Sequence, residues 1–101
     1  MTDTEITIKD REDLEKECAP IAYKELERFF AKGALILVKK NLNIIDVAEV
    51  IQSDNTEALE LWIEKGLVIR AHDDHALKWT KESANLLAVT MTPWVIVQEI
   101  D

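Results

Sequence analysis

Apolar residues recur three or four positions apart over the first third of the chain, which is the spacing of one face of an α-helix. They are Leu14, Cys18, Ile21, Ala22, Leu26, Phe29 and Phe30. Asp10 is the expected N-cap, because Glu12 and Asp13 behind it complement the helix dipole. Gly33 is the expected end of the helix. Pro20 falls inside the pattern and predicts either a kink or a new first turn.

A short apolar run and a second helical pattern come next. The run from Leu35 to Val38 has no polar interruption, which is typical of a strand that is covered on both faces. Asn43 is the expected cap of a helix in which every third or fourth residue is apolar. The inward residues of that helix are Ile44, Val47, Ala48 and Ile51.

Turn residues at 53–55 separate this helix from another, predicted over 56–65. Its inner face is Leu59, Trp62 and Ile63, and Gly66 ends it. A strand is expected over 67–69, and the acidic pair at 73–74 starts a short helix that reaches Glu82.

The closing segment, 89–97, is rich in β-branched residues and predicts a final strand. It is apolar on both faces, so it lies either inside the sheet or beneath another chain. Pro93 cannot donate to a ladder and favours an edge position or a bulge. We therefore predict a partner-binding surface that consists of Trp94, Val95, Ile96 and Val97.

The order helix, strand, helix, helix, strand, helix, strand indicates one α+β domain over residues 10–101. A helix, a strand and two helices joined by a tight turn resemble the layout of winged-helix domains, with a small, mostly antiparallel sheet. Residues 1–9 offer only Ile6 and Ile8 as alternating apolar positions, and they are expected to form a flexible arm or an edge strand. Such a likeness of fold carries no function with it.

Charge narrows the possible partners. The 101 residues include 20 acidic and 12 basic side chains, a net charge of −8. A surface of this kind repels phosphate backbones, and the helix over 56–65 exposes Glu57, Glu60 and Glu64 where a DNA reader would present basic or amide side chains. We expect no binding to nucleic acid.

Membrane insertion and export are not expected either. The longest apolar run, Ala34 to Val38, is far shorter than the roughly 20 residues of a membrane span. The first five residues lack the basic and apolar regions of a secretory signal. The expected location is the cytoplasm.

Candidate chemistry is sparse. His72, Asp73, Asp74 and His75 supply ligand types that zinc accepts, but a site needs further ligands from elsewhere. The simpler interpretation is a strand end followed by an aspartate that caps the next helix. Cys18 is the only cysteine and is expected to be a buried structural thiol. No catalytic residue and no cofactor are predicted.

Several segments together resemble an uncharacterised family of short acidic bacterial proteins, a domain of unknown function. They are Tyr23-x-Glu25-Leu26-x-x-Phe29-Phe30-x-x-Gly33, Asn43-Ile44-Ile45-x-Val47-Ala48, Trp62-x-x-x-Gly66 and Pro93-Trp94-Val95-Ile96-Val97-Gln98. The resemblance spans about residues 10–98, and its ending is the most specific part. It implies a domain boundary and no mechanism.

The leading hypothesis is a non-enzymatic protein-interaction module that forms a homo-oligomer, such as a homodimer, or binds another protein. The alternative is a small metal-dependent or acid/base enzyme centred on His72, Asp73, Asp74 and His75.

Overall fold

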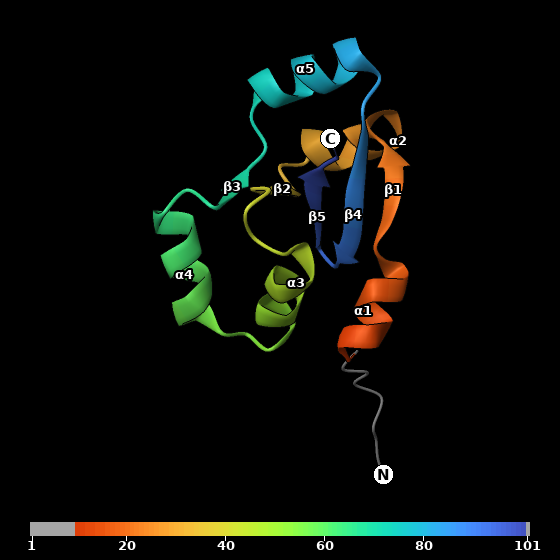
Figure 1. Cartoon of the computed structure of the whole chain (residues 1–101). Helices are drawn as coiled ribbons and strands as arrows, with labels where there is room; N and C mark the ends of the chain where they lie inside the picture. The colour runs from red at the N-terminus through yellow and green to blue at the C-terminus, as the bar shows by residue number, and fades with distance from the viewer. Residues whose placement is uncertain (1–9, 101) are drawn as a thin grey trace.

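The structure, a computed structural model, describes residues 10–100 (Figure 1). The expectation for residues 1–9 lies outside this range. Ten elements form, in the order α1 (Arg11–Glu17), β1 (Ala19–Ala22), α2 (Tyr23–Ala31), β2 (Leu35–Val38), α3 (Ile44–Gln52), α4 (Thr56–Glu64), β3 (Val68–Arg70), α5 (Asp73–Glu82), β4 (Asn85–Met91) and β5 (Trp94–Glu99). No helix among these residues is long and apolar enough to cross a bilayer.

The prediction of helical structure over residues 19–22 is wrong, because these residues form a strand, β1, that separates α1 from α2. Asp10 caps α1 as predicted, accepting the backbone N–H of Asp13 at 2.9 Å. Pro20 neither kinks nor starts a helix: it lies within β1, opposite Leu87 of β4. Tyr23 N–H donates to Ala84 O. Because successive residues of a strand direct their backbone groups to opposite sides, the nitrogen of Pro20 points toward the outer edge of the sheet, where no hydrogen-bond donor is needed.

The five strands form one mixed sheet in the order β1-β4-β5-β2-β3. β5 pairs with β2 in parallel, whereas the pairs β1–β4, β4–β5 and β2–β3 are antiparallel. The predicted closing strand is in fact a hairpin, because Pro93 lies in the turn between Met91 of β4 and Trp94 of β5.

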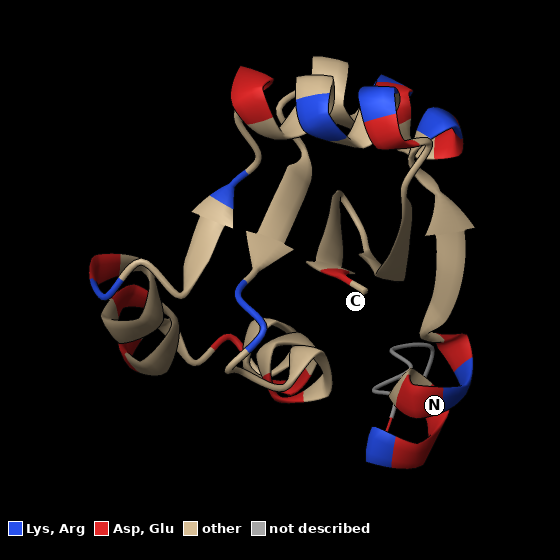
Figure 2. Cartoon of the chain, turned by 45° about the horizontal axis from the view of Figure 1, so that its top comes forward, with Lys and Arg blue, Asp and Glu red and all other residues tan. Residues whose placement is uncertain are grey.

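Helices cover both faces of this sheet, which Figure 2 shows as helices above and below the strands. On one face, α2 and α5 bury a cluster that includes Leu26, Trp79 and Val97. On the other face, α1 and α3 bury a cluster that includes Leu14, Val47 and Ile96, and α4 packs beside α3. The residues of each strand therefore alternate between two separate apolar cores.

The prediction that β5 lies at an edge is wrong. β5 lies between β4 and β2 in the sheet. Val95, Ile96 and Val97 are at most 2% exposed, because helices of the same chain cover them from both faces. Of the four residues predicted to bind a partner, only Trp94, at the beginning of the strand, is partly exposed. Three of the four residues predicted to bind a partner are thus interior to the folded chain.

Polar side chains hold the helices in place around β5. The Nε2 of Gln98 donates to the backbone oxygens of Lys39 and Leu42, at 2.8 and 2.6 Å, and so fixes the loop between β2 and α3. One Nη of Arg11 in α1 donates to carboxylates of Asp46 and Glu49 in α3, both at 2.7 Å.

The α+β class is confirmed. The predicted mostly antiparallel sheet is corrected to a mixed sheet, because β2 and β5 pair in parallel. The winged-helix-like order is not confirmed, because ten elements form where seven were expected. The helix-turn-helix pair is present as α3 and α4. The predicted cap of α3 is confirmed, because Asn43 Oδ1 accepts Ile45 N–H at 2.7 Å.

The burial of β5 predicts a large difference between two alanine substitutions. Ile96→Ala removes a side chain with no exposed area, so we expect it to lower the free energy of unfolding by about 2–5 kcal/mol. Leu77→Ala acts on a side chain that is 70% exposed and should change it by no more than about 0.5 kcal/mol. Urea unfolding measures both, and a small effect of Ile96→Ala would contradict the central position of β5.

Candidate functional site

An open apolar groove runs along the end of the sheet that contains β3. We call it the β3 groove. It has a volume of about 500 Å³ and is lined by Ile36, Ile51, Leu59, Ile63, Val68, Ile69, Arg70 and Trp94. Its members come from β2, β3, β5, α3 and α4, so only the folded sheet with its two helices creates it.

The groove exists because α3 and α4 cover only part of their face of the sheet. Side chains alternate along a strand, so Ile36 of β2 lies on the same face as Val38. Val38 is 1% exposed, whereas Ile36 and Trp94 are only half-buried. On the wall formed by α4, Ile63 is 52% exposed.

One charged side chain belongs to the lining. The guanidinium carbon of Arg70 lies 5.9 Å from the centre of the Trp94 ring, within the range of a cation–π contact. Trp94 is thus the one residue of the predicted partner-binding segment that reaches this surface. The composition of the C-terminal strand alone pointed to Trp94; nothing in the periodicity pointed to Ile36 or Arg70.

Beside the groove, the outer edge of β3 is open within the described range, because β3 is the last strand of the sheet. Lys39 N–H donates to Leu67 O, and Ala71 N–H donates to Leu35 O. By the alternation of an antiparallel ladder, the backbone groups of Val68 and Arg70 point the other way, toward the edge. An edge of this kind is able to pair with another chain.

Acidic residues occupy the exposed side of α4. Glu57, Glu60 and Glu64 are all exposed, and Thr56–Glu64 contains no Lys or Arg. Glu60 follows Leu59, and Glu64 follows Ile63, by one position, so each glutamate lies about 100° around the helix from a groove residue. The carboxylates therefore border the apolar wall. Figure 2 shows the acidic segments along the ribbon of α4.

The structure brings His72 and His75 together, with their ring centres 5.8 Å apart. His75 Nδ1 accepts the backbone N–H of His72 at 3.0 Å, and its ring stacks on Trp79. His72, not an aspartate, is the N-cap of α5, and Asp73 and Asp74 lie in its first turn. Across residues 10–100, no cluster of three or more His, Cys, Asp or Glu side chains is arranged to hold a metal ion.

The second half of α5 is tied to β5 through Glu99. Its Oε2 accepts hydrogen bonds from Trp79 Nε1 at 3.0 Å and from Lys78 Nζ at 3.1 Å. Burial raises the pKa of Glu99, but these two hydrogen bonds outweigh it, so the pKa lies below its ordinary value. The carboxylate is therefore a structural acceptor and does not act as an acid near neutral pH.

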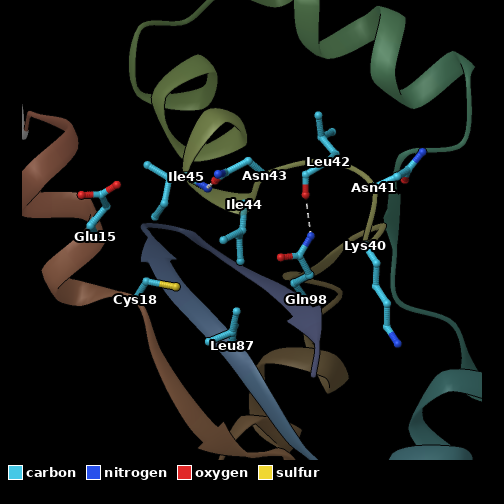
Figure 3. Close-up of a pocket in the computed structure, with 10 residues that line it drawn as sticks. All are labelled: Glu15, Cys18, Lys40, Asn41, Leu42, Asn43, Ile44, Ile45, Leu87 and Gln98. Atoms are coloured by element: carbon cyan, nitrogen blue, oxygen red, sulfur yellow. Dashed lines mark hydrogen bonds between the residues drawn. The ribbon is translucent and has the colours of Figure 1, made fainter. Parts of the chain in front are cut away.

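A second pocket, of about 530 Å³, lies where α1, the loop after β2 and the end of β5 meet (Figure 3). Glu15, Cys18, Lys40 and Gln98 supply its side chains with polar or titratable atoms, along with Asn41 and Asn43. The amide nitrogen of Gln98 holds the loop rather than facing a ligand, as the dashed line in Figure 3 marks. Asn43 already caps α3.

Cys18 is half-buried in this pocket rather than fully buried as predicted. Burial raises the pKa of its thiol, which lowers the fraction of thiolate at neutral pH. No histidine lines the pocket. Cys18 is therefore not an activated nucleophile of the kind that covalent chemistry needs.

Comparison with known proteins gives a family. The family described as "Protein of unknown function (DUF2288)" matches residues 9–99. The chain belongs to that family. This confirms the resemblance to an uncharacterised family. Among solved structures, the chain is similar to one described as "NMR solution structure of PA1075 from Pseudomonas Aeruginosa", with 35% identity and a TM-score of 0.83 over 97% of this chain and 91% of that one. No curated protein matched the sequence.

The environment of His75 predicts a pH dependence of stability. Burial, followed by the nearby His72 and Lys39, lowers the pKa of His75, and Glu99 and Asp74 oppose the shift only partly. The unfolded chain, with a pKa near 6.5, then binds the proton more readily than the folded chain. The contribution of His75 to stability is therefore complete above about pH 6.5 and is lost as the pH falls below it.

We expect His75→Gln, which keeps a hydrogen-bond acceptor at the third position of α5, to remove this pH-dependent contribution to stability. Between pH 8 and pH 5.5, urea unfolding should show a greater loss of stability in the wild type than in the variant. Equal losses would show that protonation of His75 does not oppose folding.

Cys18 supplies a second check. Because its thiol pKa is raised, iodoacetamide at pH 8 should alkylate the folded chain more slowly than the chain in urea. Mass spectrometry over time measures the two rates, and faster labelling of the folded chain would indicate an activated thiol.

Proposed function

We propose that this chain is a non-enzymatic protein-interaction module whose docking surface is the β3 groove. The observation that carries the proposal is an apolar groove with two partly exposed lining residues, Ile63 of the wall and Trp94 of the floor, in a chain of net charge −8. Exposed apolar patches bordered by polar residues are typical of surfaces that bind proteins.

The open edge of β3 supports the same surface. The outward backbone groups of Val68 and Arg70 lie next to the groove, so one partner has access to both apolar contacts and hydrogen-bonding groups. A second copy of the chain and a different protein are both compatible with this function. The surface replaces the one predicted at Trp94–Val97 and keeps only Trp94 from it.

An enzymatic function has less support. His75 Nδ1 is engaged by the backbone of His72, Glu99 is engaged by Trp79 and Lys78, and the thiol of Cys18 has a raised pKa. His75 and Glu99 are thus already engaged within the chain. No observation favours the metal-dependent or acid/base alternative at His72–His75.

Two serine variants test the proposal. Ile63→Ser makes the wall of the β3 groove polar, and Leu77→Ser removes a similar exposed side chain from α5, on the opposite side of the sheet. Each form is tagged, used to capture proteins from lysate and examined by light scattering. We expect Ile63→Ser to lose a captured protein, or to fall to monomer mass, while Leu77→Ser matches the wild type.

Both variants must keep the helical circular dichroism of the wild type. Identical captured proteins and identical mass in all three forms would contradict docking at the groove.

A further inference from the structure

We propose that the occupant of the β3 groove is a basic amphipathic helix of another protein, rather than a second copy of this chain. This inference rests on the proposed function, since it names the class of partner that fits the surface. It depends on three observations: the shape of the groove, the apolar character of its lining and the sign of the charge beside it.

The shape of the groove matches a helix better than an added strand. β3 has only three residues, and its outer edge presents the backbone groups of two of them, Val68 and Arg70. A strand added there would gain few ladder bonds. In contrast, the floor of Ile36 and Trp94 is an uncovered part of a sheet face on which α3 and α4 already pack. A further helix beside α4 would complete that layer, because neighbouring helices pack 8–10 Å apart.

The lining of the groove is almost entirely apolar. Ile63, on the wall formed by α4, is 52% exposed. Arg70 is the one charged residue in the lining. Sites for small ligands enclose the ligand and aim several polar groups at it, which this groove does not do. Apolar residues spaced i, i+3, i+4 and i+7 on a partner helix would instead follow the groove.

The charge beside the groove selects a basic partner. Glu57, Glu60 and Glu64 are exposed on α4, and Lys65 at its end and Arg70 in the lining supply two opposing charges. A symmetric dimer would place the same patch of each copy against the other, so it would bring these glutamates together between two chains of net charge −8. A helix with Lys or Arg flanking its apolar stripe meets the same carboxylates with attraction.

Two synthetic peptides of about 15 residues serve as probes. Both carry leucine at i, i+3, i+4 and i+7 spacing, and the remaining positions are lysine in one peptide and glutamate in the other. Each is titrated into the full chain labelled with ¹⁵N. We expect the lysine peptide to shift the amide signals of Ile36, Ile63 and Arg70 and the indole signal of Trp94, and the glutamate peptide to leave them unchanged.

Charge reversals at equivalent places separate the groove from general attraction. Glu60 is the fifth residue of α4, and Glu27 is the fifth residue of α2, which covers the opposite face of the sheet; both are exposed. Glu60→Lys should weaken binding of the lysine peptide roughly fivefold, the upper range for one exposed ion pair. Glu27→Lys, with the same net charge, should change it by less than about twofold.

The outcomes distinguish this inference from the proposed function. Equal binding of both peptides, or equal weakening by both charge reversals, would overturn the proposal of a basic helix. The proposed function would still be supported if Ile63→Ser abolishes binding at the groove. Signals at the groove that shift on dilution, and no longer do so in Ile63→Ser, would replace the helix by a second copy. If neither peptide nor dilution moves these signals, and Ile63→Ser changes no captured protein, both proposals fail.

Discussion

The burial of β5 on both faces is the constraint on which the rest of the structure depends. Val95 and Val97 point into one apolar core and Ile96 into the other, and all three are essentially inaccessible to water. A strand of this kind needs a partner strand on each edge and helices above and below. The chain supplies all four, with β4 and β2 beside the strand, α2 and α5 on one face, and α1 and α3 on the other. The polar end of β5 then secures its neighbours through Gln98 and Glu99.

The same arrangement leaves one surface incomplete. Covering the centre of a five-stranded sheet with short helices exposes one end of the sheet, where β3 is brief and α4 covers only part of the floor. The β3 groove is this remainder. Its apolar walls and acidic border are both consequences of α4, which turns Leu59 and Ile63 toward the sheet and carries glutamates on the adjoining face. Part of the negative charge of the chain, on Glu60 and Glu64, thus lies next to an open groove lined mainly by large aliphatic and aromatic side chains.

Local signals in the sequence were sufficient for much of the fold. The caps at Asp10 and Asn43 and the apolar run of β2 were predicted from residue type and spacing. Both caps form, as do β2 and α3, although the helix that Asp10 caps ends at Glu17. The fold class followed from their alternation. In contrast, β1 could not be distinguished from a helix, because Cys18 and Ile21 also fit a helical period, and only pairing with β4 decides the matter.

The position of β5 could not be predicted for a related reason. Apolar residues on both faces of a strand fit a central strand and a strand beneath another chain equally well. Pro93 shifted the interpretation toward an edge, but its turn position removes that constraint. The β3 groove is a property of tertiary packing, because residues from five elements line it. No local sequence pattern could therefore predict it.

Amide hydrogen exchange of the free chain tests the central position of β5 and the open edge of β3 in one measurement. The amides of Ile96 and Val97 should exchange only through global unfolding, whereas those of Val68 and Arg70, which point to the open edge, should exchange orders of magnitude faster. Fast exchange along β5 would contradict its central position. Strong protection of Val68 and Arg70 in the isolated chain would show that the edge is already covered, and would contradict a groove that awaits another protein.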